Sequence, residues 1–249
     1  MKLALLGMGR MGQEIDRLAR AAGHDVVARI DIALDPDPDP EPLPDQLRGA
    51  DVVVDFTVPR AVLGNIEGAA AAGVPMVVGT TGWYDEMDRA RALVAQAGIG
   101  FISGANFSIG AQVLMRLTQQ AATLLDRFPE YDPYVFEHHH TAKKDAPSGT
   151  AIKLAERILD AMERKRHVQT GNPDGAIDPA ALHVTSLRAG EAFGHHRVGF
   201  DAAAESIELV HTAHSREGFA LGALYAAEWI KDRKGFYEFS QLFEQGDDP

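Results

Sequence analysis

The stretch LALLGMGRMG, residues Leu3–Gly12, decides the fold of this chain. It begins as a short apolar run and ends in three glycines spaced as G-x-G-x-x-G, and residues 13–22 then carry apolar side chains at helical spacing. The pattern predicts a strand, a tight turn and a helix. The first glycine allows the turn, the second lets a pyrophosphate approach the backbone, and the third allows close packing of helix on strand. The start of the helix then offers unpaired N–H groups and a positive dipole to phosphates.

Buried-strand patterns recur through the first hundred residues, and helical stretches separate the later ones. Strands are expected at Val26–Ile30, Val52–Phe56, Pro75–Gly79 and Gly100–Ser103, and helices at Arg60–Ala72 and Tyr84–Gln96. This alternation predicts a parallel, doubly wound sheet of the Rossmann type. Proline lacks the N–H donor and fixes φ, so we expect the proline-rich segment Asp35–Pro44 to be an exposed loop rather than a helix or a central strand.

The pattern changes after Asn106. Helices are expected at Ile109–Leu125, Ser148–Met162 and Gly218–Ile230, with a short strand at Tyr134–Glu137. The runs HVTSLRA, HHRVGFDA and SIELVHTAH, which start at His183, His195 and Ser206, predict strands, and the short turns between them suggest antiparallel pairing. We therefore expect an α/β protein with a dinucleotide-binding domain at 1–107, a smaller α+β domain at 108–216, and a C-terminal helix at 217–249 that returns to the first domain.

Composition excludes several classes of function. The 249 residues are 45% hydrophobic, as in a globular protein with a real core, and the formal net charge is −12. Because no long basic run offsets the carboxylates, neither nucleic acid nor an acidic membrane is the expected partner. The absence of cysteine excludes disulfides, thiolate metal sites and a thioester mechanism. The apolar N-terminal run ends at Gly7, too early for a signal peptide or a membrane span, and we expect a cytoplasmic protein.

Asp31 supports the cofactor prediction and bears on the choice of cofactor. It directly follows the second strand, where a carboxylate hydrogen-bonds the ribose hydroxyls of a dinucleotide. A carboxylate there repels a 2′-phosphate, and no arginine or lysine follows before Arg48, so NADH should be preferred. Arg10 could still contact a phosphate, which leaves NADPH possible. The alternative is a plain strand–helix turn with a chance aspartate.

Two further loops follow predicted strands at the sheet edge where open α/β sheets bind ligands. They are Gly79–Gly82 (GTTG) and Ser103–Phe107 (SGANF), and an asparagine in the second suits a nicotinamide carboxamide. Taken alone, a loop of this kind is more often an ordinary turn. The predicted cofactor-binding residues are Gly7, Met8, Gly9, Arg10, Met11, Gly12, Asp31, Phe56, Gly79, Thr80, Thr81, Ala105, Asn106 and Phe107.

The segment EHHHTAKKDAPSGT, Glu137–Thr150, has the chemistry of a substrate site. Its consecutive histidines would point to alternate sides of an extended chain, so they cannot converge on one metal ion, and no metal site is predicted. Anion binding fits better, because the lysines at 143 and 144 precede a helix whose expected N-cap is Ser148, with the N–H groups of Gly149 and Thr150 available to a carboxylate. A histidine beside a lysine can also supply protons near neutral pH. The alternative is a solvated basic loop that caps a helix.

This segment resembles the signature H-H-x-x-K-x-D-A-P-S-G-T of the 4-hydroxy-tetrahydrodipicolinate reductase (dihydrodipicolinate reductase) family, which belongs to the diaminopimelate route to lysine. The resemblance extends over nearly the whole chain and in the same order. Its other parts are the Gly7 loop, Val54–Thr57 (VDFT), Gly79–Gly82, Asn106–Ser108 (NFS) and Arg188–Glu191 (RAGE).

The resemblance implies a function and roles for residues. It implies NAD(P)H-dependent reduction of a small cyclic dicarboxylate, 4-hydroxy-tetrahydrodipicolinate, to tetrahydrodipicolinate, with His139 as the catalytic proton donor or acceptor and Lys143 as a second proton donor. His140, Gly149 and Thr150 would hold the substrate carboxylates. The second domain would bind substrate and build a homotetramer.

The chain also departs from the family pattern. Its glycine loop is one residue shorter than in many members, and Thr141 and Ala142 replace basic residues found in some relatives, so the pocket should be less positive. Two rival functions are another dehydrogenase with a similar first domain, which gives no reason for the signature segment, and a redox-sensing regulator, in which His139 and Lys143 would be dispensable.

Overall fold

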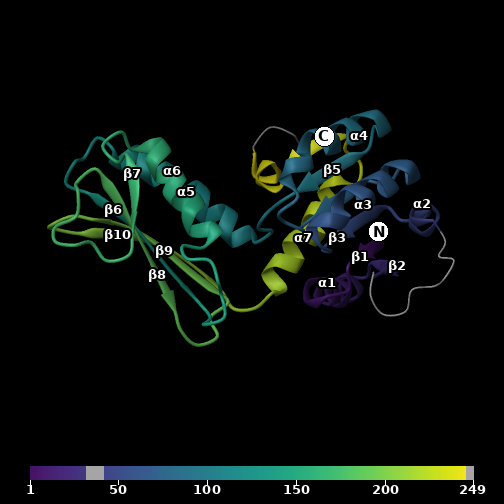
Figure 1. The fold of residues 1–249 in the computed structure, drawn as a ribbon, viewed down its shortest axis with the longest axis horizontal. Helices are drawn as coiled ribbons and strands as arrows, with labels where there is room; N and C mark the ends of the chain where they lie inside the picture. The colour runs from purple at the N-terminus through teal and green to yellow at the C-terminus, as the bar shows by residue number, and fades with distance from the viewer. Residues whose placement is uncertain (32–41, 245–249) are drawn as a thin grey trace. The chain divides into compact units, whose positions relative to one another are not determined.

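The computed structural model describes residues 1–31 and 42–244, which form two compact units (Figure 1). Unit 1 contains residues 1–108 and the chain from Glu217 onward, and unit 2 contains Ile109–Arg216. Most of the proline-rich segment at 35–44 lies outside the described residues. Across those that are described, no helix is both long and apolar enough to cross a membrane.

Unit 1 is built on a six-stranded sheet in which every pairing is parallel, with the order β11-β5-β4-β3-β1-β2. The strands are β1 (Lys2–Leu6), β2 (Asp25–Ile30), β3 (Val52–Asp55), β4 (Met76–Val78), β5 (Gly100–Ser103) and β11 (Gly235–Glu238). The sheet confirms the predicted Rossmann-type α/β fold. The edge strand β11 was not anticipated from its sequence.

Two groups of helices accompany this sheet. In one group α1 (Arg10–Ala21) packs on α7 (Glu217–Ile230), and α7 also contacts the three central strands β3, β4 and β5. In the other group α3 (Pro59–Ala72) contacts both α2 (Leu43–Leu47) and α4 (Met87–Ala97). The short 3-10 helices η1 (Tyr84–Glu86) and η2 (Phe239–Phe243) complete the unit.

The helix α2 corrects one prediction. The predicted end of the proline-rich loop, Pro44, is wrong, because Leu43 and Pro44 already belong to this helix. Proline is tolerated in the first turn of a helix, where its missing N–H would have no intrahelical partner.

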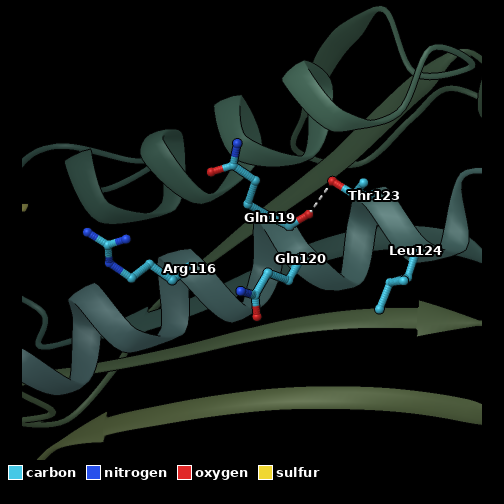
Figure 2. A pocket seen from close by; sticks show the side chains of 5 residues that line it. All are labelled: Arg116, Gln119, Gln120, Thr123 and Leu124. Atoms are coloured by element: carbon cyan, nitrogen blue, oxygen red, sulfur yellow. Dashed lines mark hydrogen bonds between the residues drawn. The ribbon is translucent and has the colours of Figure 1, made fainter. Parts of the chain in front are cut away.

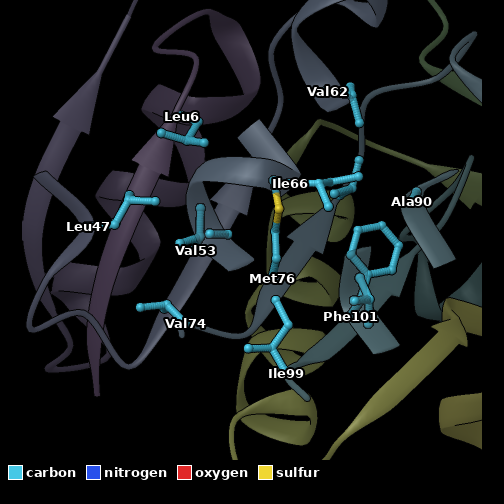
Figure 3. Packing of buried hydrophobic residues seen from close by; sticks show 14 of the residues in the cluster. Leu6, Leu47, Val53, Val62, Ile66, Val74, Met76, Ala90, Ile99 and Phe101 are labelled. Carbon is cyan, nitrogen blue, oxygen red and sulfur yellow. The ribbon is translucent and has the colours of Figure 1, made fainter. Parts of the chain in front are cut away.

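The core of unit 1 explains why its strands read as continuous apolar runs (Figure 3). The central strands β1, β3, β4 and β5 have helices to pack against, and their residues are almost all buried. Leu6, Val53, Met76 and Phe101 meet Ile66 of α3 in one cluster. Each fully buried large side chain of this kind contributes roughly 1.5–3 kcal/mol relative to an exposed one.

Unit 2 is a five-stranded mixed sheet with the order β10-β9-β6-β8-β7. Its strands are β6 (Asp132–His139), β7 (His167–Thr170), β8 (Ala181–Arg188), β9 (Gly194–Asp201) and β10 (Ser206–Ala213). The helices α5 (Ile109–Leu125) and α6 (Gly149–Ala161) pack on each other, α6 contacts β6 and β8, and α5 contacts β10. The unit is the smaller α+β part that the sequence predicts.

The pairing of these strands differs from the prediction in one place. The strands β9 and β10 are antiparallel as expected, but β8 does not pair with β9, because β6 lies between them and is parallel to β8 and antiparallel to β9. The five residues that link β8 to β9, 189–193, can span up to about 17 Å. Two strand spacings amount to roughly 10 Å, so a short link is long enough to pass over the end of β6.

Candidate active site

The predicted cofactor loops lie along one edge of the unit 1 sheet. Since β1, β3, β4 and β5 are parallel neighbours, the loops that follow them leave from the same side. Backbone hydrogen bonds extend the ladders into these loops, from Phe56 N to Leu6 O at 2.9 Å and from Gly79 N to Asp55 O at 2.9 Å. The structure thus brings together the Gly7 loop, Phe56, Gly79–Thr81 and Ala105–Phe107, which are distant in sequence.

The glycine loop has the shape that a dinucleotide phosphate requires. Gly7 adopts a positive φ of 84°, and a Cβ at Gly12 would lie 2.0 Å from the Gly7 carbonyl oxygen, so both positions need glycine. Gly9 is exposed, with nothing within 4 Å of where its Cβ would be, and it precedes α1 without a side-chain cap. The start of α1 therefore has free space beside Gly9 and no side-chain cap, so the residues present fit the phosphates of a nicotinamide dinucleotide.

Asp31 and Arg10 are the two charged residues predicted to bind the cofactor beside this loop. The Asp31 carboxylate accepts a hydrogen bond from the Met8 N–H at 3.1 Å, so it also fixes the glycine loop to the end of β2. Arg10 is exposed at the start of α1.

Asp55 holds the next two loops together, and the sequence reasoning missed it. It is fully buried, and its carboxylate accepts hydrogen bonds from the Thr57 N–H at 2.8 Å, the Thr80 hydroxyl at 3.0 Å and the Asn65 side chain at 2.7 Å. The local signal is an aspartate that directly ends the apolar run of β3. Thr80 is thereby oriented by Asp55.

Aromatic rings and an asparagine turn shape the rest of this edge. A Cβ at Gly79 would lie 2.1 Å from the Phe56 ring, so glycine is needed for the two loops to meet. Phe107 contacts Phe56, with ring centroids 5.9 Å apart, and the Asn106 side-chain oxygen accepts the Ser108 N–H at 2.8 Å.

In unit 2, the three consecutive histidines point in different directions, as the sequence predicts for an extended chain. His139 is buried on the same face as Glu137, whereas the His138 ring lies 2.8 Å from the Ala189 carbonyl oxygen. His140 is half-buried at the end of β6, where its N–H donates to Ala192.

Glu137 is the centre of a buried hydrogen-bond network. One carboxylate oxygen contacts His139 Nδ1, and the other accepts from Arg188 Nη2 at 2.7 Å and from the Ser148 N–H at 3.2 Å. Burial by itself would raise the pKa of the Glu137 carboxyl, but the hydrogen bonds from His139 and Arg188 outweigh it and hold this pKa well below its usual range. The carboxylate is therefore ionised and orients the imidazole of His139.

A second buried histidine, His196 of β9, lies beside this pair and was not singled out from the sequence. Its ring is 5.1 Å from the His139 ring, and its Nε2 is 3.3 Å from the Ser148 hydroxyl. Burial first, and then the neighbouring His139, lowers the pKa of His196 to about 3, so this ring is neutral at physiological pH. The register that pairs Glu137 with His196 puts both on one face, and no local sequence signal reveals that register.

Glu137, His139 and His196 also have potential metal-ligating atoms within 4.8 Å of one another. However, the Glu137 oxygens already accept three hydrogen bonds or close contacts, and the Arg188 guanidinium would repel a cation at this distance. The arrangement therefore favours proton chemistry over metal binding.

The segment after His139 leads into α6 as the sequence predicts. Ser148 is the N-cap, and its hydroxyl accepts the Ala151 N–H at 3.2 Å. Gly149 is exposed, and no other described atom lies within 4 Å of the position that a Cβ would take there. Lys143 pairs with Asp145 at 2.8 Å, and this hydrogen bond lowers the pKa of the Asp145 carboxyl.

A separate pocket in unit 2 contains none of the predicted site residues. Figure 2 shows its lining side chains, which all come from α5: Arg116, Gln119, Gln120, Thr123 and Leu124. Thr123 bonds back to the Gln119 carbonyl, as surface threonines in helices often do.

Comparison with known proteins identifies the family. The family model described as dihydrodipicolinate reductase, N-terminus, matches residues 1–107, and the one described as dihydrodipicolinate reductase, C-terminus, matches residues 110–243. The chain belongs to the dihydrodipicolinate reductase family.

Individual members of the family match over nearly their whole length. The chain is 38% identical to the 4-hydroxy-tetrahydrodipicolinate reductase of Christiangramia forsetii, over 97% of each protein. It is 37% identical to that of Archaeoglobus fulgidus, over 98% of this chain and 100% of the relative. The dipicolinate-bound dihydrodipicolinate reductase of Paenisporosarcina sp. TG-14 has a similar structure, with a TM-score of 0.79 at 26% identity, covering 98% of this chain and 99% of the other.

The family membership confirms the activity predicted from the sequence. The chain is an NAD(P)H-dependent oxidoreductase that reduces 4-hydroxy-tetrahydrodipicolinate in lysine and diaminopimelate biosynthesis. A nicotinamide cofactor follows from the family and from the Rossmann-type sheet.

Proposed function

We propose that this dihydrodipicolinate reductase binds its substrate and delivers protons at the corner between β6 and α6 of unit 2, residues 137–150. The observation that carries the proposal is the buried His139 on the ionised Glu137, next to the capped start of α6. In the same scheme residues 1–107 bind the dinucleotide, and the segment 217–249 completes the first domain.

The substrate carboxylates are assigned to His140, Gly149 and Thr150. The first turn of α6 carries a positive end of the helix dipole, and the open space in front of Gly149 leaves room for an anion. The dipicolinate bound to the relative from Paenisporosarcina supports a cyclic dicarboxylate as the ligand.

The protons are assigned to His139 and Lys143. When bound, the cofactor supplies a hydride to C4 of the substrate ring, from which the 4-hydroxyl is lost as water. His139 and Lys143 then supply the proton that the adjacent ring carbon requires. Glu137 keeps the His139 ring in one orientation, and Asp145 does the same for the Lys143 ammonium group. The cationic forms of His139 and Lys143 also stabilise the negative charge that develops on the substrate ring.

The cofactor is assigned to the edge residues of unit 1, with NADH preferred and NADPH also used. The glycine loop and the first turn of α1 would hold the pyrophosphate, and Asp31 would hold the adenosine ribose.

The preference is testable with Asp31→Ala. Without this carboxylate the variant should lose affinity for NADH on the order of tenfold, since one charge-assisted hydrogen bond contributes about 1.5–3 kcal/mol. Affinity for NADPH should fall less, because the repulsion of the 2′-phosphate is also removed. Titration of both cofactors by fluorescence measures the two dissociation constants. Equal losses for both would contradict the role.

The carboxylate site is testable by titrating dipicolinate into the variant Gly149→Pro. Proline is compatible with the first position of a helix, and Ser148 already has the extended conformation that precedes proline, so the change removes one N–H with little other effect. We expect dipicolinate affinity to fall on the order of tenfold. The matched variant Gly149→Ala, which keeps the N–H, should bind more tightly than Gly149→Pro. Equal affinities in the two variants would refute the assignment.

Two further proposals are a homotetramer built through unit 2, which rests on the family resemblance, and a cytoplasmic location, with which a role in lysine biosynthesis is compatible.

A further inference from the structure

Arg188, the last residue of β8, occupies a junction that the reaction scheme does not use. In the parallel pairing of β6 with β8 it lies opposite His139, and the two strands are joined there by a hydrogen bond from Ala189 N to His139 O at 3.1 Å. Its guanidinium is mostly buried, with 18% of the side chain exposed. The site therefore contains a mostly buried arginine besides the lysines at 143 and 144.

One nitrogen of this guanidinium reaches both halves of the site. Arg188 Nη2 donates to the Glu137 carboxylate at 2.7 Å and to the Asp145 carbonyl oxygen at 2.6 Å. The other terminal nitrogen, Nη1, donates to the Leu187 carbonyl at 2.8 Å, which fixes the plane of the group. The guanidinium thus makes three hydrogen bonds, which together restrict its orientation.

Two of these partners, Glu137 and Asp145, in turn contact the proposed proton donors. The second oxygen of Glu137 contacts His139 Nδ1, and the Asp145 carboxylate pairs with Lys143 Nζ at 2.8 Å. A continuous chain of contacts therefore runs from His139 through Glu137, Arg188 and Asp145 to Lys143.

We propose that Arg188 is a positioning residue that holds His139 and Lys143 in their reactive orientations through Glu137 and Asp145. This inference rests on the proposed roles of His139 and Lys143. A fully buried carboxylate keeps its charge only beside a compensating cation, and Arg188 provides that cation for Glu137. A neutral Glu137 would no longer favour the His139 tautomer with the proton on Nδ1. The contact with the Asp145 backbone also fixes the loop that carries Lys143.

The groups that face His139 determine what the test should show. These groups are Glu137 and the buried His196. Ser148 contacts both of them, through its N–H to Glu137 and through its hydroxyl to the His196 ring. When Arg188 is removed, Glu137 should take up a proton at higher pH than in the native protein. The acid-side fall of kcat should therefore move to higher pH.

The experiment compares native protein with Arg188→Met and Arg188→Lys in the reductase assay, and Arg197→Met serves as a matched control. Arg197 belongs to the same sheet and pairs with Glu208 at 3.1 Å, but that pair is solvent-exposed. We expect kcat of Arg188→Met to fall on the order of tenfold or more, less than on removal of the proton donor itself, with KM for NADH unchanged. Arg188→Lys should recover part of the loss, and Arg197→Met should match native protein.

Two results would overturn the proposal: a pH profile of kcat that does not move in Arg188→Met, or equal losses in Arg188→Met and Arg197→Met. If Arg188→Met does not fold, Glu137→Gln and the double variant Glu137→Gln with Arg188→Lys provide the test. In the Glu137→Gln background, Arg188→Lys should then lower kcat by less than a further twofold. If the losses of kcat from the two changes multiply as independent effects do, coupling through Glu137 is contradicted. A native kcat in His139→Gln would show that the proposed roles themselves fail, and the inference would fail with them; a loss of kcat in His139→Gln without the expected result in Arg188→Met would contradict the inference alone.

Discussion

At the scale of single residues, the chemistry of the site depends on how buried charges are compensated. An unpaired carboxylate in the protein interior costs several kcal/mol. Glu137 avoids this cost through Arg188, His139 and the Ser148 N–H. The same contacts orient His139, so one set of interactions stabilises the buried charge and would also fix the proposed proton donor.

His196 makes stability depend on pH in a direction that can be predicted. Its pKa is lowered to about 3 in the folded protein, whereas a histidine in the unfolded chain titrates near the ordinary value of about 6.5. Between these values only the unfolded state binds the proton, so the free energy of unfolding falls as the pH decreases below about 6.5.

At about pH 5 this single group should lower the free energy of unfolding by about 2 kcal/mol relative to about pH 8. Urea unfolding of native protein and of His196→Asn at both pH values measures the effect. The variant should show the smaller change, while the control His167→Asn, at an exposed position, should follow native protein. Parallel pH dependence in native protein and His196→Asn would show that His196 is not the cause.

The part of the proposed site that can be predicted from the sequence lies in one continuous motif. The roles of His139 and Lys143 stay predictions from the family resemblance, whereas the alternating histidines and the N-cap Ser148 follow from strand alternation and helix capping and are present in the structure. Asp55 and His196 were missed because their roles come from contacts with other strands and loops. Those contacts depend on strand register, which periodicity does not specify.

At the scale of secondary-structure elements, the β1–α1 unit shows how closely sequence and function are linked. Gly12 is needed for packing, because any side chain there would collide with the Gly7 carbonyl, whereas Gly9 borders open space. The two glycines of one motif thus have different physical roles.

The variants Gly9→Ala and Gly12→Ala should therefore separate stability from cofactor binding. Gly12→Ala should destabilise the protein by about 1–3 kcal/mol through overpacking. Gly9→Ala should keep native stability but bind NADH more weakly, on the order of tenfold, because its Cβ occupies the space a phosphate would approach. Thermal unfolding and NADH titration of both variants provide the comparison. A native affinity in Gly9→Ala would contradict the phosphate assignment.

The elements also show where sequence patterns are insufficient. The buried strands β1, β3, β4 and β5 were predicted because runs covered by helices are apolar throughout. The edge strand β2 was predicted from a similar apolar run, but its residues are not buried. The order of strands in unit 2 was not, since the short link between β8 and β9 looks like a hairpin turn although β6 lies between the two strands. Short edge strands such as β7 and β11 carry too few residues to show a period.

At the scale of the whole molecule, the proposed roles are divided between the two units. Unit 1 carries the glycine loop and Asp31, which we assign to the cofactor, and unit 2 carries His139, Lys143 and the start of α6, which we assign to the substrate. The two family models match residues 1–107 and residues 110–243.

The most direct test of the proposed site is the initial rate of NADH oxidation with freshly generated 4-hydroxy-tetrahydrodipicolinate, measured for native protein, His139→Gln and Lys143→Ala. The control His167→Gln replaces an exposed histidine of the same sheet. We expect turnover by native protein and by His167→Gln, and a loss on the order of 100-fold or more in each of the other variants. Native rates in both His139→Gln and Lys143→Ala, or no turnover by native protein, would contradict this expectation.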